Sequence, residues 1–167
     1  IGFVPQRESV DWDFPVQVLD VVMMGTYRRL GWFRWPGKAQ RDWAMECLSA
    51  VGMADLYSRQ IGELSGGQQQ RVFIARALAQ DAKIILMDEP FAGVDLLSIQ
   101  DIKGLLLKLQ ARGCAVLITD HNASQLLSVV DRAYVIANGN IVANGTPQKI
   151  VNTAEAKKLY FGEDFRF

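Results

Sequence analysis

The stretch that decides the fold is Leu64-Ser65-Gly66-Gly67-Gln68-Gln69-Gln70-Arg71, followed after an apparent helix by Ile84-Ile85-Leu86-Met87-Asp88-Glu89-Pro90. The short apolar run from Ile84 to Met87 predicts a strand that is buried on both faces of a parallel sheet. Asp88 and Glu89 come directly after this strand. Because ligands of open α/β sheets bind at the carboxyl ends of the strands, we expect both carboxylates to lie in a binding site.

The residue types at this strand end fit phosphate chemistry. Asp88 is the candidate Mg²⁺ ligand, because an aspartate there suits a metal bound to nucleotide phosphates. Glu89 is the candidate base that polarises the attacking water. Upstream, Ser65-Gly66-Gly67 opens a helix whose backbone N–H groups can face a phosphate without a Cβ in the way. Each half alone also fits a plainer reading, an ordinary strand end and an ordinary helix cap.

Two further polar residues follow predicted strands. Pro5 ends an N-terminal strand and places Gln6 in the next loop. Ala115–Thr119 predicts a second buried strand, and His121, the only histidine of the chain, follows it at the same sheet edge as Asp88. An imidazole there can hydrogen-bond a γ-phosphate and hold the attacking water in line. A glutamine or histidine that stands alone is more often an ordinary surface residue.

Periodicity and turn signals predict the remaining elements. Asn138-Gly139 is a strong signal for a type I′ hairpin turn. Gly113 is expected to end the helix before it. The expected helices are Val16–Tyr27, Gln40–Val51, Gln68–Gln80, Gln100–Arg112 and a short one to Val151, and the hairpin strands are Ala133–Ile136 and Asn140–Ala143.

The composition excludes several classes of protein. The chain has 167 residues, half of them hydrophobic, which is enough for one packed domain. Lys plus Arg and Asp plus Glu both number 18, so no basic field favours nucleic-acid binding. No apolar run approaches the length of a membrane span. Cys47 and Cys114 lack metal-site spacing, and we expect buried, reduced thiols of a cytoplasmic protein.

In this order and spacing, the motifs resemble those of the ATP-binding cassette (ABC) ATPases. The resemblance implies a P-loop NTPase-like α/β fold with a mainly parallel sheet and a helical subdomain, ATP as the nucleotide, and Mg²⁺. It assigns Glu89 and His121 as catalytic residues and Gln6 and Asp88 as metal contacts. The nucleotide contacts that it implies, from the Q-loop, signature, Walker B and D-loop motifs, are Gln6, Leu64, Ser65, Gly66, Gly67, Gln68, Asp88 and Asp95.

The resemblance also divides the chain. Residues 11–80 correspond to the helical and signature subdomain, 81–145 to the core with the Walker B strand, D-loop and switch histidine, and 146–167 to a C-terminal tail. No Walker A motif is found. The stretch Gly31–Lys38 is similar to the Walker A pattern G-x-x-x-x-G-K-[ST], but it does not match it. Five residues instead of four separate its glycines, and Ala39 stands where the pattern has serine or threonine. We therefore expect the carboxyl portion of a longer ATPase, inactive alone, whose first strands and P-loop precede Ile1.

Two subfamilies are resembled. The part from Ile1 to about Asp95 looks like the ATPase of a manganese/zinc-type importer, and the part from Phe91 onward looks like the ATPase of lipopolysaccharide export. A natural mosaic, an engineered chimera and an unusual family member all stay open. The importer-like stretches are Val4–Glu8, Asp11–Pro15, Asp20–Gly25 and Gln60–Leu64; the exporter-like stretches are Phe91–Asp95, Ile118–Asn122, Asp131–Tyr134 and Gly162–Phe165.

The family's partners follow from the same resemblance. They are a second ATPase subunit, as a head-to-tail homodimer, and a transmembrane permease, which implies a peripheral location on the cytoplasmic face of the inner membrane. The aromatic-basic stretch Arg28–Lys38 suits nucleic acid or a protein contact, and zero net charge favours the permease. A nonhydrolytic interaction module stays open, whereas a DNA-repair ATPase head is disfavoured because no heptad run occurs. The aromatic tail Tyr160–Phe167 suits the core or a partner.

Overall fold

The computed structural model describes residues 1–6, 9–27, 30 and 35–157. They fall into two compact units, one over Ile1–Thr119 and one in the part from Asp120 onward, and each unit is described here by itself. The division into 11–80, 81–145 and 146–167 stays a prediction.

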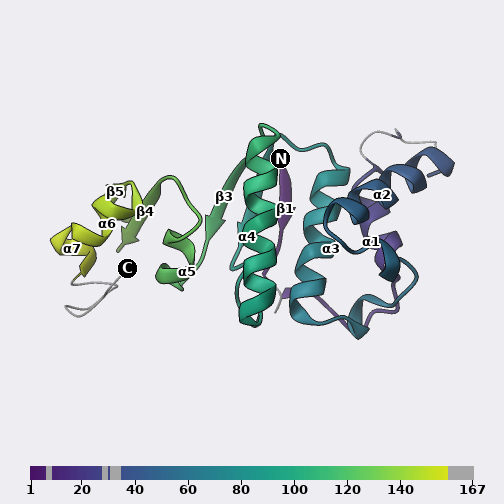
Figure 1. Cartoon of the computed structure of the whole chain (residues 1–167), viewed down its shortest axis with the longest axis horizontal. Coiled ribbons are helices and arrows are strands. Elements are labelled where there is room, and N and C mark those ends of the chain that lie inside the picture. Colours follow the sequence, from purple (N-terminus) through teal and green to yellow (C-terminus); the bar gives the residue numbers. More distant parts are fainter. Residues whose placement is uncertain (7–8, 28–29, 31–34, 158–167) are drawn as a thin grey trace. The chain divides into compact units, whose positions relative to one another are not determined.

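The first unit contains a parallel sheet of three strands, of which Figure 1 labels β1 and β3. Its order is β1-β2-β3, with β1 at Gly2–Val4, β2 at Ile84–Asp88 and β3 at Ala115–Thr119. Both neighbouring pairs are parallel, and Asp88, the last residue of β2, is in register with Thr119, the last residue of β3. The structure confirms the predicted strands and their parallel pairing.

The expectation that β2 is buried on both faces is wrong for this structure, and so is the expectation that β3 is a buried strand, since none of its residues is buried. Ile85 and Met87 are fully buried on one face, whereas Ile84 on the other face is 46% exposed. Phe3 and Leu117, which flank Leu86 on that same open face, are 47% and 56% exposed. The physical reason is topological: both connections step the same way across the sheet, and right-handed crossovers then place their helices on a single face.

The helices of the first unit pack on that buried face and on one another. Helix α3 contacts β1 and α4, α4 contacts β3, and α1 and α2 pack on α3 and on each other, as the side-by-side α3 and α4 in Figure 1 illustrate. The bounds are α1 Val18–Met24, α2 Lys38–Ala50, the 3₁₀ helices η3 Ala54–Leu56 and η4 Ile61–Glu63, α3 Gly66–Ala79 and α4 Leu96–Ala111.

The bounds of α1, α2, α3 and α4 all differ from the expected ones, and for α1 and α4 a local reason is clear. Helix α1 starts later than Val16, because Gln17 forms an antiparallel bridge with Gln60 and the Val16 carbonyl accepts the Ile61 N–H at 3.0 Å. Helix α4 starts earlier than Gln100, because the Asp95 side chain caps it. The expected end of α4 is confirmed, with Gly113 directly after the cap position at φ +77°.

The second unit is built on a hairpin. Strands β4 (Ala133–Ala137) and β5 (Asn140–Gly145) pair antiparallel. Asn138 and Gly139 both have positive φ, at 49° and 76°, which confirms the predicted type I′ turn. Short helices α5 (Ala123–Leu127), α6 (Pro147–Asn152) and α7 (Ala154–Ala156) complete it. A small cluster forms its core: Leu127, Ala133, Ala143, Ile150 and Ala156.

Within the part of the chain that the structure describes, no helix has the length and apolar character needed to cross a membrane.

Candidate functional site

Three strand ends of the first unit meet at one edge of the sheet. Gln6 follows β1, Asp88 ends β2 and Glu89 follows it, and Thr119 ends β3. Gln6, Asp88 and Glu89 are half-buried, whereas Thr119 is exposed. The structure therefore brings together three residues predicted for the site: Gln6, Asp88 and Glu89. Gln6 and Glu89, which are in contact, lie 83 positions apart in the sequence.

Gln6 and Glu89 are joined by a direct hydrogen bond. The Gln6 side-chain amide Nε2 donates to Glu89 Oε2 at 2.7 Å. This is a short contact for an N–H donor, as expected when the acceptor is an ionised carboxylate. The bond holds one oxygen of the candidate base in a fixed position next to the loop after β1.

The backbone of Glu89 is in the left-handed region, with φ +45°. That conformation is uncommon for a residue other than glycine and costs on the order of 1–3 kcal/mol. Two main-chain hydrogen bonds hold it: the Glu89 N–H donates to the Thr119 carbonyl at 2.8 Å, and the Glu89 carbonyl accepts the Ala92 N–H at 3.1 Å. The sharp turn directs the chain away from β2 immediately after Asp88.

Asp88 is bound by a residue that the sequence reasoning missed. The Thr119 hydroxyl Oγ1 donates to Asp88 Oδ1 at 2.5 Å. The signal was present in the sequence, because two parallel strands predicted to end side by side place their last residues in register. The sequence alone does not single out Thr119, because a threonine at a strand end has a recognisable partner only once the strand register is known.

The donor set at this edge fits Mg²⁺. Among the described residues, no group of three or more His, Cys, Asp or Glu side chains converges to hold a metal by itself. Mg²⁺ does not need such a cage, because it is usually held by one or two carboxylates together with substrate phosphates and water. Asp88 supplies a hard carboxylate oxygen where the strands end.

The predicted signature stretch is a well-capped helix start. Ser65 is the N-cap of the 14-residue helix α3, and its hydroxyl accepts the Gln68 N–H at 3.3 Å. In return the Gln68 side chain accepts the Ser65 N–H at 2.9 Å, which completes a capping box. Leu64 is buried. The first-turn N–H groups of Gly66 and Gly67 have no acceptor within the helix and carry the positive end of its dipole.

Packing also requires a glycine at position 67, in addition to the access that a glycine gives to a phosphate. A Cβ at this position would lie 2.2 Å from Ser98 Cβ and 2.3 Å from Ser98 Oγ. Ser98 in turn donates its N–H to Asp95 Oδ1 at 2.9 Å, and its hydrogen bonds hold the pKa of the Asp95 carboxyl below its ordinary value. The beginnings of α3 and α4, with the predicted signature and D-loop residues, are thus in direct contact.

His121 belongs to the second unit, so the structure does not test its predicted place at the sheet edge of Asp88. Its side chain is 73% exposed, and its Nδ1 lies 4.0 Å from Asp120 Oδ1. The catalytic role of His121 stays a prediction.

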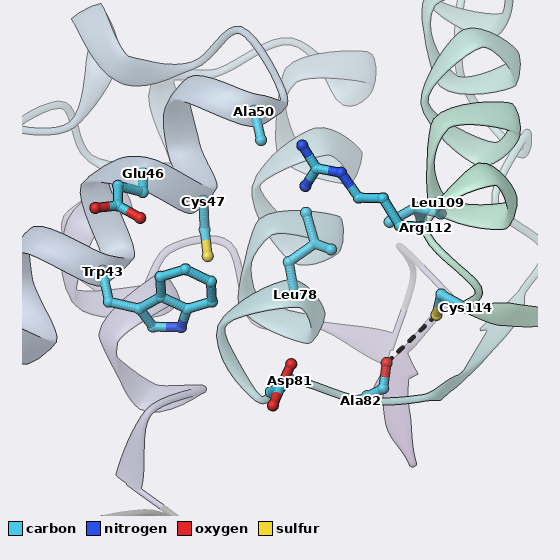
Figure 2. Close-up of a pocket in the computed structure, with 10 residues that line it drawn as sticks. All are labelled: Trp43, Glu46, Cys47, Ala50, Leu78, Asp81, Ala82, Leu109, Arg112 and Cys114. Carbon is cyan, nitrogen blue, oxygen red and sulfur yellow. Dashed lines mark hydrogen bonds between the residues drawn. The ribbon is translucent and has the colours of Figure 1, made fainter.

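The two cysteines line a cavity at the other end of the strands (Figure 2). The cavity has a volume of about 270 Å³ and lies among the ends of α2, α3 and α4, where Ala82 precedes β2 and Cys114 precedes β3. Both cysteines are buried and neither forms a disulfide, as predicted. Cys114 Sγ donates to the Ala82 carbonyl at 3.3 Å, and burial raises the pKa of this thiol. The cavity is separate from the carboxylate edge.

The structure has the α/β fold with a parallel sheet that the motifs predict, and comparisons with known proteins identify its family. A family model described as ABC transporter matches residues 1–92. The zinc transport system ATP-binding protein TroB of Treponema pallidum is 45% identical over 97% of this chain and 60% of its own length. The manganese transport system ATP-binding protein MntB of Halalkalibacterium halodurans is 44% identical over 97% of this chain and 64% of its own.

The structural comparison gives the same result. An inward-facing transporter described as metal-chelate type ABC superposes with a TM-score of 0.86 and 31% identity, covering 95% of this chain and 62% of the other. The chain belongs to the ABC transporter family and is similar to the ATP-binding subunits of manganese and zinc transport systems. It spans about 60% to 64% of the length of these curated relatives.

The metal-transport relatives match both halves of the chain, since each alignment covers 97% of it. They give no support to the lipopolysaccharide-export alternative for the second half. The expected resemblance at Gly162–Phe165 and the aromatic-basic residues Trp32, Phe33 and Arg34 lie outside the described residues.

Proposed function

We propose that the complete protein is the ATP-hydrolysing subunit of an ABC transporter for a divalent metal ion, of the manganese or zinc type. The observation that supports this most is the Gln6–Glu89 hydrogen bond beside Asp88, because all three residues lie at one sheet edge and all three are candidates for the site. The names of the similar proteins support the choice of metal.

In the proposed reaction, Glu89 accepts a proton from a water molecule as the water oxygen attacks the γ-phosphorus of ATP. The bond from that phosphorus to the β,γ-bridging oxygen breaks, and ADP and phosphate are released. Asp88 would hold Mg²⁺, which neutralises charge on the phosphates. Gln6 orients the Glu89 carboxylate through its bond to Oε2. His121 is proposed to donate a hydrogen bond to the γ-phosphate.

The proposed active unit is a head-to-tail homodimer. The start of α3 offers the Gly66 and Gly67 N–H groups and a positive dipole end, which suit a phosphate. No P-loop occurs in these 167 residues, and the relatives are longer than this chain. We propose that the rest of the complete protein supplies the P-loop and that ATP lies between the P-loop of one subunit and the α3 start of the other. Docking on a permease would then place the protein at the cytoplasmic face of the membrane.

Phosphate release by the complete protein with ATP and Mg²⁺ tests the proposal. We expect turnover that depends on both. A complete protein that binds no ATP would overturn the ATPase proposal and would favour a nonhydrolytic interaction module.

The permease contact is expected to use the first half of the chain. Trp35, within the aromatic-basic stretch Arg28–Lys38, is 91% exposed, and large exposed aromatics are frequent anchors of protein interfaces. We expect Trp35→Ala to weaken binding of the complete protein to a divalent-metal permease by about 2 kcal/mol, roughly thirtyfold in Kd. Co-purification and titration against the reconstituted permease measure this.

Tyr134→Ala is the matched control, because Tyr134 is an exposed aromatic of the second unit and lies outside the first half of the chain. It should leave permease binding unchanged. Stable association with a lipopolysaccharide permease alone, unaffected by Trp35→Ala, would refute the metal assignment and leave the ATPase proposal intact.

A further inference from the structure

Thr119 makes two separate contacts to the two carboxylate residues at the end of β2, one to Asp88 and one to Glu89, which follows the strand. Its side-chain hydroxyl donates to Asp88 Oδ1 at 2.5 Å, and its main-chain carbonyl accepts the Glu89 N–H at 2.8 Å. The Met87 carbonyl is also near the hydroxyl, at 3.4 Å. A hydroxyl has one proton, and the shorter contact to an acceptor-only carboxylate receives it.

We propose that Thr119 is a positioning residue that fixes the Asp88 carboxylate for the divalent cation of Mg²⁺-ATP, an inference that rests on the proposed function. Threonine is β-branched and therefore stiff about χ1 in a strand, so the direction of its hydroxyl is set by β3. The register of Asp88 opposite Thr119 brings the two side chains together without a flexible linker. A charge-assisted bond of this length is among the stronger hydrogen bonds in proteins.

The bond can orient the Asp88 carboxylate without blocking it for a cation, because it uses only one of the two carboxylate oxygens. Thr119 uses Asp88 Oδ1, and no described residue donates a hydrogen bond to Oδ2. Oδ2 is the oxygen that the bond leaves for a cation. Hydrogen-bond partners of metal-binding carboxylates of this kind typically change metal affinity by 10- to 100-fold, as an order of magnitude, when they are removed.

The two contacts of Thr119 can be separated by mutation. Thr119→Val keeps the β-branched shape and the main-chain carbonyl, so the Glu89 turn keeps its hydrogen bond while Asp88 loses its donor. Thr119→Ser keeps the hydroxyl and loses only a methyl group. Thr119 is exposed, so neither change opens a cavity in the core.

The experiment is a titration of the complete protein with Mn²⁺, as a paramagnetic substitute for Mg²⁺, in the presence of a nonhydrolysable ATP analogue and followed by electron paramagnetic resonance. We expect Thr119→Val to lower Mn²⁺ affinity by about tenfold or more, with metal-free affinity for the analogue and Tm close to wild type. Thr119→Ser should retain near wild-type affinity. Excess Mg²⁺ should restore turnover of the valine variant, since the defect lies in binding the cation.

Equal Mn²⁺ affinity in wild type and Thr119→Val would overturn the inference, and so would an equal loss in Thr119→Ser, which would assign the effect to shape. Both outcomes leave the proposed function standing if the wild-type protein hydrolyses ATP. A wild-type protein that binds neither the analogue nor ATP would overturn the proposed function and this inference together.

Discussion

Glu89→Gln is expected to lower the ATP turnover of the complete protein by about 100- to 10,000-fold, the range contributed by a positioned general base. The substituted amide cannot take the proton of the attacking water. Its oxygen can still accept the hydrogen bond that Gln6 donates to Glu89 at 2.7 Å, so the geometry of the strand ends should persist. ATP binding should therefore be retained. Turnover by phosphate release and binding by titration with labelled ATP measure the two quantities separately.

Glu46→Gln is the matched control for this change. Glu46 is an exposed residue of α2 that lines the cavity at the other end of the strands. The same loss of a carboxylate there should leave turnover within about twofold of wild type, because isolated surface charges contribute little. Near-normal turnover of Glu89→Gln would show that another group is the base.

Gly67→Ala is expected to destabilise the protein by about 1–3 kcal/mol, the usual cost of overpacking. The added Cβ would lie 2.2 Å from Ser98 Cβ, so the beginnings of α3 and α4 would have to separate. Urea unfolding of the complete protein measures the change. Gly104→Ala in the middle of α4 is the control: nothing lies within 4 Å of a Cβ there, and alanine is the better helix former, so this variant should be neutral or more stable.

A double-mutant cycle distinguishes packing from phosphate access at Gly67. Ser98→Gly removes both atoms that the new methyl group would meet most closely. The loss of unfolding free energy caused by Gly67→Ala should then be smaller in the Ser98→Gly background than in wild type. The expected difference between the two losses is about 0.5–3 kcal/mol. Turnover should recover in parallel. A stable Gly67→Ala protein with reduced turnover that Ser98→Gly does not recover would indicate that only phosphate access requires glycine here.

Much of the local structure follows from short-range chemistry. Ser65 and Gln68 form the capping box that their spacing favours, and Asn138-Gly139 forms the expected turn, because both depend on neighbours in the sequence. The parallel strand β2 follows from an apolar run bounded by turn residues. The family could be inferred from the motifs for the same reason, since each motif is contiguous.

The features that the sequence did not reveal depend on contacts between distant residues. The Thr119–Asp88 bond requires the register of two strands, and the contact of Gly67 with Ser98 requires the packing of two helices. The open face of the sheet could not be predicted in this way. Hydropathy shows that Ile84 is apolar, but it does not show whether another element covers the Ile84 side chain. The spacing of apolar residues in the sequence does not reveal which face of the sheet the connecting helices cover.

The central claim is that ATP joins two copies of the complete protein, through the α3 start of one and the P-loop of the other. Molar mass of the Glu89→Gln protein, measured in solution with and without ATP and Mg²⁺, tests it most directly. We expect the mass of one subunit without nucleotide or with ADP, and twice that mass with ATP and Mg²⁺. A mass that stays at one subunit while ATP is bound at saturation would contradict the claim.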